Sequence, residues 1–304
     1  MTTEATGRQR AGGVRGLCVA TGRGIAYMIV GCALLTLNDA LVKWTTAGYP
    51  VGQILFVRGG FVFLPIAFLI WRMGGLGVLR VYNHGGQALR AMLVVVATFL
   101  FITGLSLLPL ADAIAIAFAG PLIATALAPF LLGERVGWRR WSAVIVGFGG
   151  VLLMARPSGN VVAWAVLLPL GATICGALRD ILTRRIAATE SSVGILFYTT
   201  TAVTIAGGVS LTYYGWTPMP WQDAGILALA AMLMAGAHYL QIEAFRFAEA
   251  TAVTPYRYTS MVWAILFGYL IWSHLPSGGM LAGATLVIGS GLYIWHRERR
   301  FKGV

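Results

Sequence analysis

The sequence predicts an all-α integral membrane protein with ten transmembrane helices arranged as two inverted five-helix repeats. The composition, the spacing of the apolar runs and the sidedness of the basic residues carry this prediction. Apolar residues make up 58% of the 304-residue chain and charged residues only 11%, whereas a soluble domain carries about 25% charged residues. So little charge cannot cover a water-facing surface, and the mean hydropathy of +0.80 agrees.

The apolar runs supply ten candidate spans. A helix needs roughly 20 apolar residues to cross the hydrocarbon core, so ten spans leave no room for a soluble domain of useful size. Helices are expected because a helix satisfies its own backbone groups in lipid, and the runs are too long and uniform for barrel strands. The predicted spans are residues 24–44, 52–71, 89–107, 111–132, 141–154, 161–183, 192–213, 224–245, 251–272 and 280–295.

The segments that flank the spans are short and basic. Residues 1–23 form a glycine-rich tail, and residues 297–304 form a second tail. The first apolar run continues into Asn38, Asp39 and Lys43 rather than into a small-residue cleavage site. We therefore interpret it as a retained span and not as a signal peptide.

The basic residues indicate the orientation in the membrane. Of the 22 Lys and Arg residues, 18 fall in the tails and alternate loops of one side, and Arg156 alone falls on the other side. The remaining three, Lys43, Arg58 and Arg257, lie within spans. The positive-inside rule then predicts both termini in the cytoplasm of a bacterial inner membrane protein. Topology thereby explains the net charge of +12, and we expect no binding of nucleic acid.

Neither a metal nor a cofactor is expected. The three cysteines, Cys18, Cys32 and Cys175, are scattered and show no disulfide or metal-binding spacing. The chain also has no phosphate-binding P-loop pattern, which excludes ATP-driven transport by this chain alone.

A self-comparison indicates an internal duplication with a shift of about 141 residues. The matched positions keep their order along the chain, and residues 24–154 and 155–296 are the predicted repeats. The matches are Ile54-Leu55-Phe56 with Ile195-Leu196-Phe197, Asp39-x-Leu41-x-Lys43 with Asp180-x-Leu182-x-Arg184, and, 140 residues apart, Gly149 with Gly289. Because each half has an odd number of spans, the halves should lie in the membrane in opposite orientations. Inverted repeats are typical of secondary transporters, whose sites lie between the halves.

Motifs in both halves resemble the EamA-type branch of the drug/metabolite transporter superfamily over roughly residues 24–296. The pattern departs from the family at Ser273-His274, where the second half lacks the Gly-Glu pair of the first. The motifs are Leu108-Pro109-Leu110-Ala111-Asp112-Ala113, Pro121, Leu132-Gly133-Glu134-Arg135, Arg156-Pro157, Ala252-Val253-Thr254-Pro255-Tyr256-Arg257-Tyr258 and Trp263-Ala264. The resemblance implies ten helices in two inverted repeats and the movement of small organic metabolites. It is similar in particular to members that take up S-adenosylmethionine or riboflavin.

Charged residues within spans are candidate gating or coupling residues. Each costs about 2.5–3.5 kcal/mol at mid-bilayer, so it must pair, face the interior or lie near an interface. Asp39 and Lys43 are spaced i,i+4 on one helical face, and Arg58 and Asp112 fall at a similar outer depth. We predict an outer gate of alternating charges. A static pair that only satisfies a helix end, and a proton-coupling role for Asp39, are the alternatives.

The repeat places a second acid–base pair at the inner surface. Asp180 and Arg184 repeat the spacing of Asp39 and Lys43. We predict that this pair forms an inner gate that breaks in turn with the outer one.

The eighth and ninth spans supply most of the predicted substrate-binding residues. Arg257 could bind a carboxylate or phosphate through its guanidinium fork, and Tyr256 and Tyr258 could stack on a ring. Pro255 should free a backbone carbonyl and kink the helix. The alternative is that Arg257 extends to the inner surface.

Further cavity-lining residues follow from spacing. His238 and Gln241 share a helical face, and Asn38 and Trp263 lie near the centres of their spans. The alternative for His238 is a hydrogen bond within its own bundle. In the fourth span, Pro121 and Pro129 mark an expected bend, and glycines such as Gly150 and Gly207 are expected to allow close helix packing.

The function predicted is a secondary transporter that moves a small organic metabolite by alternating access. Its expected partners are that substrate and the lipid bilayer, and a homo-oligomer is compatible with one complete pathway per chain. A lipid-carrier flippase is the first alternative. An integral membrane enzyme is a weaker one, because no histidine pairs in sequence with a second catalytic candidate. The four histidines are His84, His238, His274 and His296.

Overall fold

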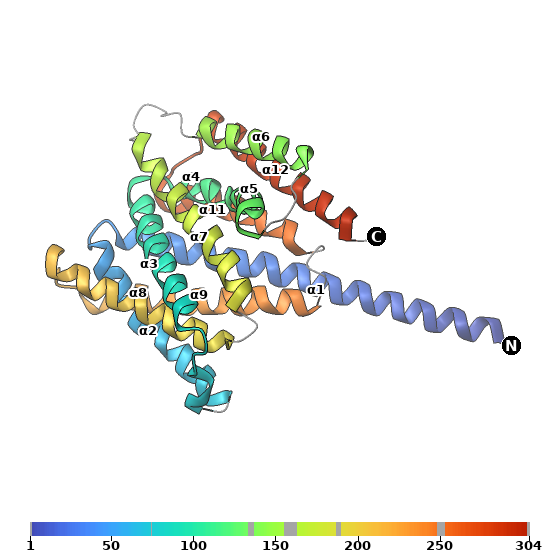
Figure 1. The fold of residues 1–304 in the computed structure, drawn as a ribbon, viewed down its shortest axis with the longest axis horizontal. Helices are drawn as coiled ribbons and strands as arrows, with labels where there is room; N and C mark the ends of the chain where they lie inside the picture. The colour runs from blue at the N-terminus through green and yellow to red at the C-terminus, as the bar shows by residue number, and fades with distance from the viewer. Residues whose placement is uncertain are drawn as a thin grey trace.

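A computed structural model describes residues 2–73, 75–132, 137–154, 163–186, 190–247 and 253–302, and all regular elements among them are helical (Figure 1). The first half contains α1 (Thr2–Thr45), α2 (Val51–Arg72), η1 (Gly75–Leu79), α3 (His84–Leu107), α4 (Leu110–Ala117), α5 (Gly120–Leu132) and α6 (Trp138–Met154). The second half contains η2 (Ala163–Val166), α7 (Leu167–Ile186), α8 (Ser192–Tyr214), α9 (Trp221–Phe247), η3 (Thr254–Tyr258), α11 (Thr259–Trp272) and α12 (Gly278–Lys302). Each of the predicted apolar runs contains helix.

Seven of the described helical segments are long and apolar enough to cross a membrane. They are Gly22–Thr45, Val51–Arg72, His84–Leu107, Leu110–Leu127, Trp164–Thr183, Val193–Tyr214 and Trp221–Ala244. Trp141–Met154 and Gly278–Ile294 are shorter apolar helices, and α11 has 14 residues. The chain is therefore a multi-pass helical membrane protein, with seven described segments of spanning length where the sequence predicted ten spans.

The fourth predicted span is interrupted earlier than expected. The helix ends at Ala117 and resumes at Gly120, so the break precedes both prolines. Pro121 lies in the first turn of α5, where a missing N–H removes no intrahelical hydrogen bond. Pro129 lies inside α5. The predicted bend exists, but it does not lie at either proline.

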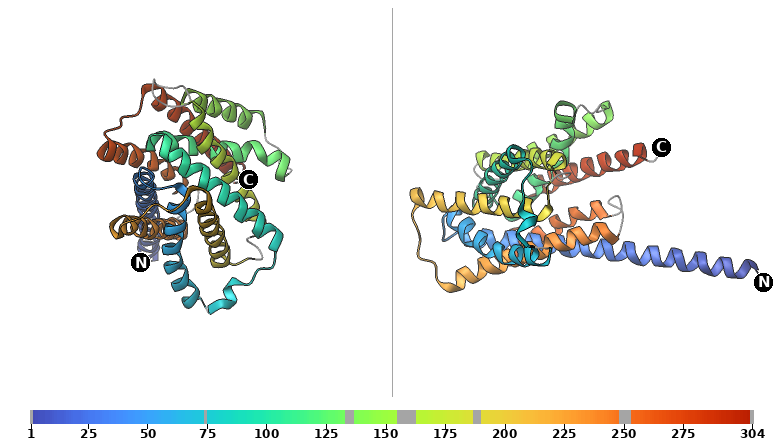
Figure 2. Two further views of the ribbon diagram at one scale, coloured as in Figure 1. Left: turned by 90° about the vertical axis from the view of Figure 1, so that its left-hand side faces the viewer. Right: turned by 60° about the horizontal axis from the view of Figure 1, so that its bottom comes forward.

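The packing of the helices follows the repeat. The most extensive contacts join α1 with α9, α3 with α7, α2 with α8 and α6 with α12, and Figure 2 shows the blue α1 beside α9 and the green α6 beside the red α12. In the duplicated sequence α1 corresponds to α7 and α3 to α9. Exchanging the two halves therefore converts the α1–α9 pair into the α7–α3 pair. It converts the α2–α8 and α6–α12 pairs into themselves. Two like halves facing each other produce this pattern.

Glycines allow the closest of these contacts. A Cβ atom at Gly150 would lie 2.6 Å from the Gly283 carbonyl, and one at Gly207 would lie 2.7 Å from the Gly52 carbonyl. The backbones of α6 and α12, and of α2 and α8, therefore touch at these positions. At Gly149 the space is open, so this glycine is not required for packing.

Both ends of the chain extend to the same side of the helical bundle (Figure 1). An even number of crossings would place them so. Helix α1 begins at Thr2, so the predicted N-terminal tail continues the first span as helix.

Candidate functional site

Lys43 binds the C-terminal end of α3. Its Nζ donates to the carbonyls of Leu105 at 2.5 Å and Leu108 at 2.7 Å. The last carbonyls of a helix lack intrahelical partners and carry partial negative charge, so an ammonium is stabilised there. Nζ also lies 5.5 Å from the ring centroid of Trp272, and Asp112 is close enough to attract it electrostatically. Lys43 thus joins α1 to the α3–α4 junction.

Asp39 has different partners. The side chain of Asn38 donates to its Oδ1 at 2.9 Å, and Arg58 on α2 is its attractive electrostatic neighbour. No N–O distance within 4.0 Å joins any two of Asp39, Lys43, Arg58 and Asp112, all of which are described. The four charges therefore form two loose pairs, Asp39 with Arg58 and Lys43 with Asp112. The predicted contact of Asp39 with Lys43 is wrong, because the lysine turns toward the end of α3.

The counterpart in the second half is arranged differently again. The carboxylate of Asp180 accepts from its neighbour Arg179, with Nε–Oδ1 at 2.9 Å and a second guanidinium nitrogen at 2.8 Å. Its side chain is 64% exposed, and Arg90 on α3 is another electrostatic neighbour. The side chain of Arg184 lies outside the described residues.

Three elements from the two halves carry arginines that act electrostatically on His238. The imidazole on α9 senses Arg58 from α2, Arg179 from α7 and Arg257 from η3. Its Nδ1 lies 2.9 Å from the Met234 carbonyl on the same helix. The local hydrogen bond predicted as the alternative for His238 is therefore present, and the three arginines also act on the ring electrostatically.

Arg257 itself is unpaired among the described residues. Its side chain is exposed, and no hydrogen bond or ion pair engages its guanidinium within that part of the chain. Its carbonyl accepts from the thiol of Cys32 at 3.8 Å and from the backbone N–H of Thr259. A guanidinium without a carboxylate partner is free to bind an anionic group.

The two tyrosines beside Arg257 pack against their surroundings. Tyr258 makes an edge contact with Phe118, with ring centroids 5.1 Å apart, and its hydroxyl reaches Gly291 on α12. Tyr256 packs on an apolar cluster around Met28. Both tyrosines anchor η3 in the bundle, and stacking on a substrate ring remains a prediction.

Pro255 begins an element instead of kinking one. It occupies the first turn of the 3₁₀ helix η3, which runs directly into α11. The expected kink is wrong because a proline in the first turn of a helix leaves no acceptor without its donor.

Two predicted cavity-lining residues hold unpaired polar atoms. Asn38 Oδ1 and Trp263 Nε1 are buried without a hydrogen-bond partner. An unpaired buried polar group costs about 1–3 kcal/mol. Each of these two atoms is therefore available to form a hydrogen bond with a ligand. Gln241 is tightly packed, because a Cβ atom at Gly31 would lie 3.0 Å from its Cγ.

Two arginines were missed as site residues. Arg90 donates through Nε to Thr183 Oγ1 at 2.8 Å and through a terminal nitrogen to Thr199 Oγ1 at 2.5 Å, and Arg179 faces His238. Arg90 falls inside the predicted span 89–107 but was counted as a loop residue. Its position within an apolar run was the signal that could have identified it.

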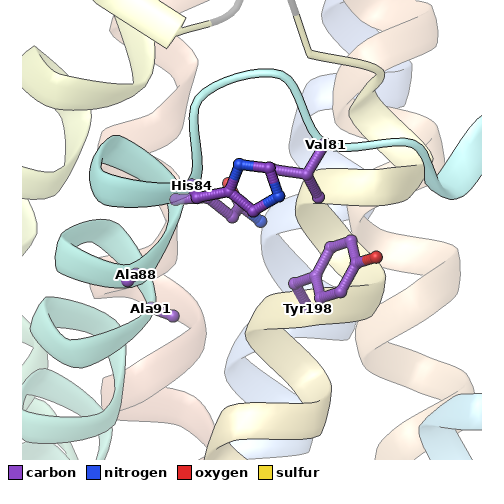
Figure 3. A pocket seen from close by; sticks show the side chains of 6 residues that line it. Val81, His84, Ala88, Ala91 and Tyr198 are labelled. Carbon is purple, nitrogen blue, oxygen red and sulfur yellow. The ribbon is translucent and has the colours of Figure 1, made fainter.

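Two cavities lie away from this cluster. One of about 220 Å³ lies between α3 and α8 (Figure 3), and one of about 80 Å³ includes Asp112 and His274. The larger is lined by Val81, His84, Gln87, Ala88, Ala91 and Tyr198. Neither contains a residue predicted to bind substrate, and of the predicted gating residues only Asp112 lines one.

A helical bundle of two like halves, with intramembrane cations gathered where the halves meet, is the architecture of a membrane transporter. The chain belongs to the EamA-like transporter family, whose model matches residues 22–156 and again 163–295. The family match thus falls twice, once on each predicted repeat.

Several curated proteins are similar over most of their length. A riboflavin transporter of Rhizobium johnstonii is 27% identical over 280 residues, covering 91% of this chain and 92% of that protein. An S-adenosylmethionine uptake transporter of Rickettsia bellii is 27% identical, covering 91% and 94%. A pseudopaline exporter of Pseudomonas aeruginosa is 25% identical, covering 87% and 93%. A solved crystal structure with 18% identity superposes with a TM-score of 0.60 over 93% of this chain and 99% of its own, which supports the fold.

Proposed function

We propose that the protein is a secondary transporter that moves a small organic metabolite bearing an anionic group across the bacterial inner membrane. The observation that carries this proposal is that Arg58, Arg179 and Arg257 all act electrostatically on His238, while the Arg257 guanidinium has no partner in the described structure. These residues come from both halves, as a site between inverted repeats requires. Guanidinium groups bind carboxylate and phosphate through paired hydrogen bonds.

The charge balance of the site favours an anion or a zwitterion. Asp39 lies near Arg58, and Asp180 is bound to Arg179, but the Arg257 guanidinium has no partner in the described structure. A bare cation would therefore be repelled. S-adenosylmethionine, named for one group of relatives, carries a carboxylate as well as a sulfonium and fits this balance.

In the proposed cycle, substrate binding lets the two halves rock and expose the site to each side in turn. A ligand shifts such an equilibrium only through different affinities for the two states. The pairs of Asp39 with Arg58 and of Lys43 with Asp112 are proposed outer gating contacts. Asp180 belongs to the proposed inner gate, with both termini in the cytoplasm as the charge distribution predicts.

Counterflow into preloaded proteoliposomes tests the proposal. The panel contains S-adenosylmethionine, riboflavin, and aromatic and neutral amino acids. We expect trans-stimulated uptake of one compound. The variant Arg257→Ala should weaken its Kd by about tenfold or more, since a hydrogen bond to a charged group is lost.

The matched control is Arg139→Ala, whose guanidinium lies 5.3 Å from the Trp138 ring and away from the site. Unchanged binding in Arg257→Ala contradicts the assigned site. Folded protein that shows no counterflow with the panel but moves lipid-linked substrates would instead identify a lipid-carrier flippase.

A further inference from the structure

Hydrogen bonds between the two halves gather at opposite ends of α2 and α8. One group joins Tyr49 and Gln53, at the start of α2, to Thr217 and Asp223 near the α8–α9 connection; we name it the α8–α9 latch. The other joins residues 78–83, before α3, to the start of α8, and we name it the α2–α3 latch. Helix α2 has 22 residues, so about 33 Å separate the two groups.

In the α8–α9 latch, side chains of the first half bind the second half. The Tyr49 hydroxyl donates to the Asp223 carboxylate. The amide of Gln53 pairs with the backbone of Thr217, donating to its carbonyl at 2.7 Å and accepting from its N–H at 3.0 Å. The bond to Asp223 raises the pKa of the Tyr49 hydroxyl above its ordinary value, so Tyr49 remains a donor at neutral pH.

In the α2–α3 latch, side chains of the second half bind the backbone of the first. Glu190 Oε1 accepts from the N–H groups of Tyr82 at 2.8 Å and Asn83 at 2.6 Å. Ser191 donates to the Val78 carbonyl at 2.5 Å, and Tyr198 to the Leu79 carbonyl at 2.9 Å. Every bond in this latch crosses from one half to the other.

The two latches occupy equivalent positions of the duplicated sequence. Tyr49 and Glu190 are 141 residues apart, and so are Tyr82 and Asp223. This is the same shift that relates the two repeats. The contact of Tyr49 with Asp223 at one end therefore corresponds, position for position, to the contact of Glu190 with Tyr82 at the other.

The latches differ in strength. The Glu190 side chain is 9% exposed and accepts two backbone N–H groups. Asp223 is only half-buried and accepts one phenol hydroxyl. Charge-assisted hydrogen bonds are strong, and burial strengthens them because water does not screen them. The α2–α3 latch also contains one more hydrogen bond.

We propose that each latch is a further contact of one of the two gates of the carrier, that both are closed in this structure, and that the weaker α8–α9 latch releases first. The empty protein then opens toward the side of the α8–α9 connection, which the charge distribution places outside. This inference rests on the proposed transport function and adds which contacts break and in which order. The backbones of α2 and α8 touch at Gly52 and Gly207, next to the α8–α9 latch.

Hydrogen–deuterium exchange of the full chain in lipid nanodiscs, without substrate, tests the proposal. The amides to follow are Thr217 in one latch and Tyr82 and Asn83 in the other, each expressed as a protection factor. We expect lower protection at Thr217. Equal protection, or lower protection at Tyr82 and Asn83, overturns the proposed order of release.

Two matched substitutions separate the latches. Tyr49→Phe and Tyr198→Phe each remove one hydroxyl. Each should lower protection by about fivefold at its own latch only, the factor expected for one hydrogen bond of ordinary net strength. Glu190→Gln should lower protection of Tyr82 and Asn83 by about tenfold or more. Tyr213→Phe, whose side chain is 84% exposed, is the control.

If Tyr49→Phe or Tyr198→Phe lowers protection at both latches, or at neither, the two latches do not open independently and the proposal is overturned. Because exchange is measured without substrate, its outcome does not depend on whether counterflow succeeds. If counterflow fails but each variant lowers protection only at its own latch, the proposed substrates are rejected and the proposal about the two latches stands.

Discussion

The end of α1 and the end of α7 carry the same acid–base motif but make different contacts. In α1, Asp39 is held by Asn38 beside Arg58, and Lys43 binds the carbonyls at the end of α3. In α7, the exposed Asp180 pairs with the adjacent Arg179. A duplicated motif therefore keeps its position in the fold while its neighbours decide its role. One end joins helices, and the other carries an exposed ion pair.

The largest effect that this comparison predicts follows from Lys43→Met. The substitution leaves two carbonyls at the end of α3 without their donor and Asp112 without its attractive neighbour. We expect the free energy of unfolding to fall by about 1–3 kcal/mol, the cost of leaving partly buried hydrogen-bonding groups without a partner. Reversible unfolding by SDS in mixed micelles measures it, and a loss below about 1 kcal/mol would contradict the anchoring role.

A double-mutant cycle identifies the partner of Lys43. We expect Lys43→Met and Asp112→Asn to be coupled by about 1–2 kcal/mol, because the two charges face each other. Lys43→Met with Asp39→Asn should be nearly additive, since these residues do not touch. The reverse result would restore the i,i+4 pair that the sequence predicted.

The smallest effect is expected at the other end of the comparison. Asp180→Asn removes an exposed ion pair, whose contribution to stability is typically about 0–1 kcal/mol. Added salt should reduce even this difference. An unfolding loss as large as that of Lys43→Met would show that the two ends are more alike than their contacts indicate.

Much of the fold could be predicted from local sequence. Each predicted apolar run contains helix, and the shift of 141 residues reappears in the pairing of helices and in both latches. The bend of the fourth span lies after Ala117 and not at Pro121 or Pro129, and Pro255 is the second residue of η3 and does not lie inside a longer helix. Proline marks a backbone irregularity without deciding whether it lies inside or at the start of a helix.

The candidate site could be predicted only in part. The cost of charge in lipid identified Arg58, Arg257 and Asp39 one by one. Arg90 and Arg179 were counted only as loop or junction residues, because a span boundary uncertain by a few residues moves a charge from lipid to water. Gln53 and Glu190 carry no sequence signal of their role, since their partners are backbone groups of the other half.

The sequence by itself determined that this chain is a multi-pass helical membrane protein built from two related halves. Hydropathy and repeated motifs are properties of neighbouring residues, so no tertiary contact is needed to detect them. Only the tertiary structure decided that Arg58, Arg179 and Arg257 act electrostatically on the same residue, His238, and that Lys43 turns to α3 rather than to Asp39. The physical reason is that helix packing decides which groups lie near each other, and the two carbonyls that Lys43 binds are 62 and 65 residues away from it in the chain.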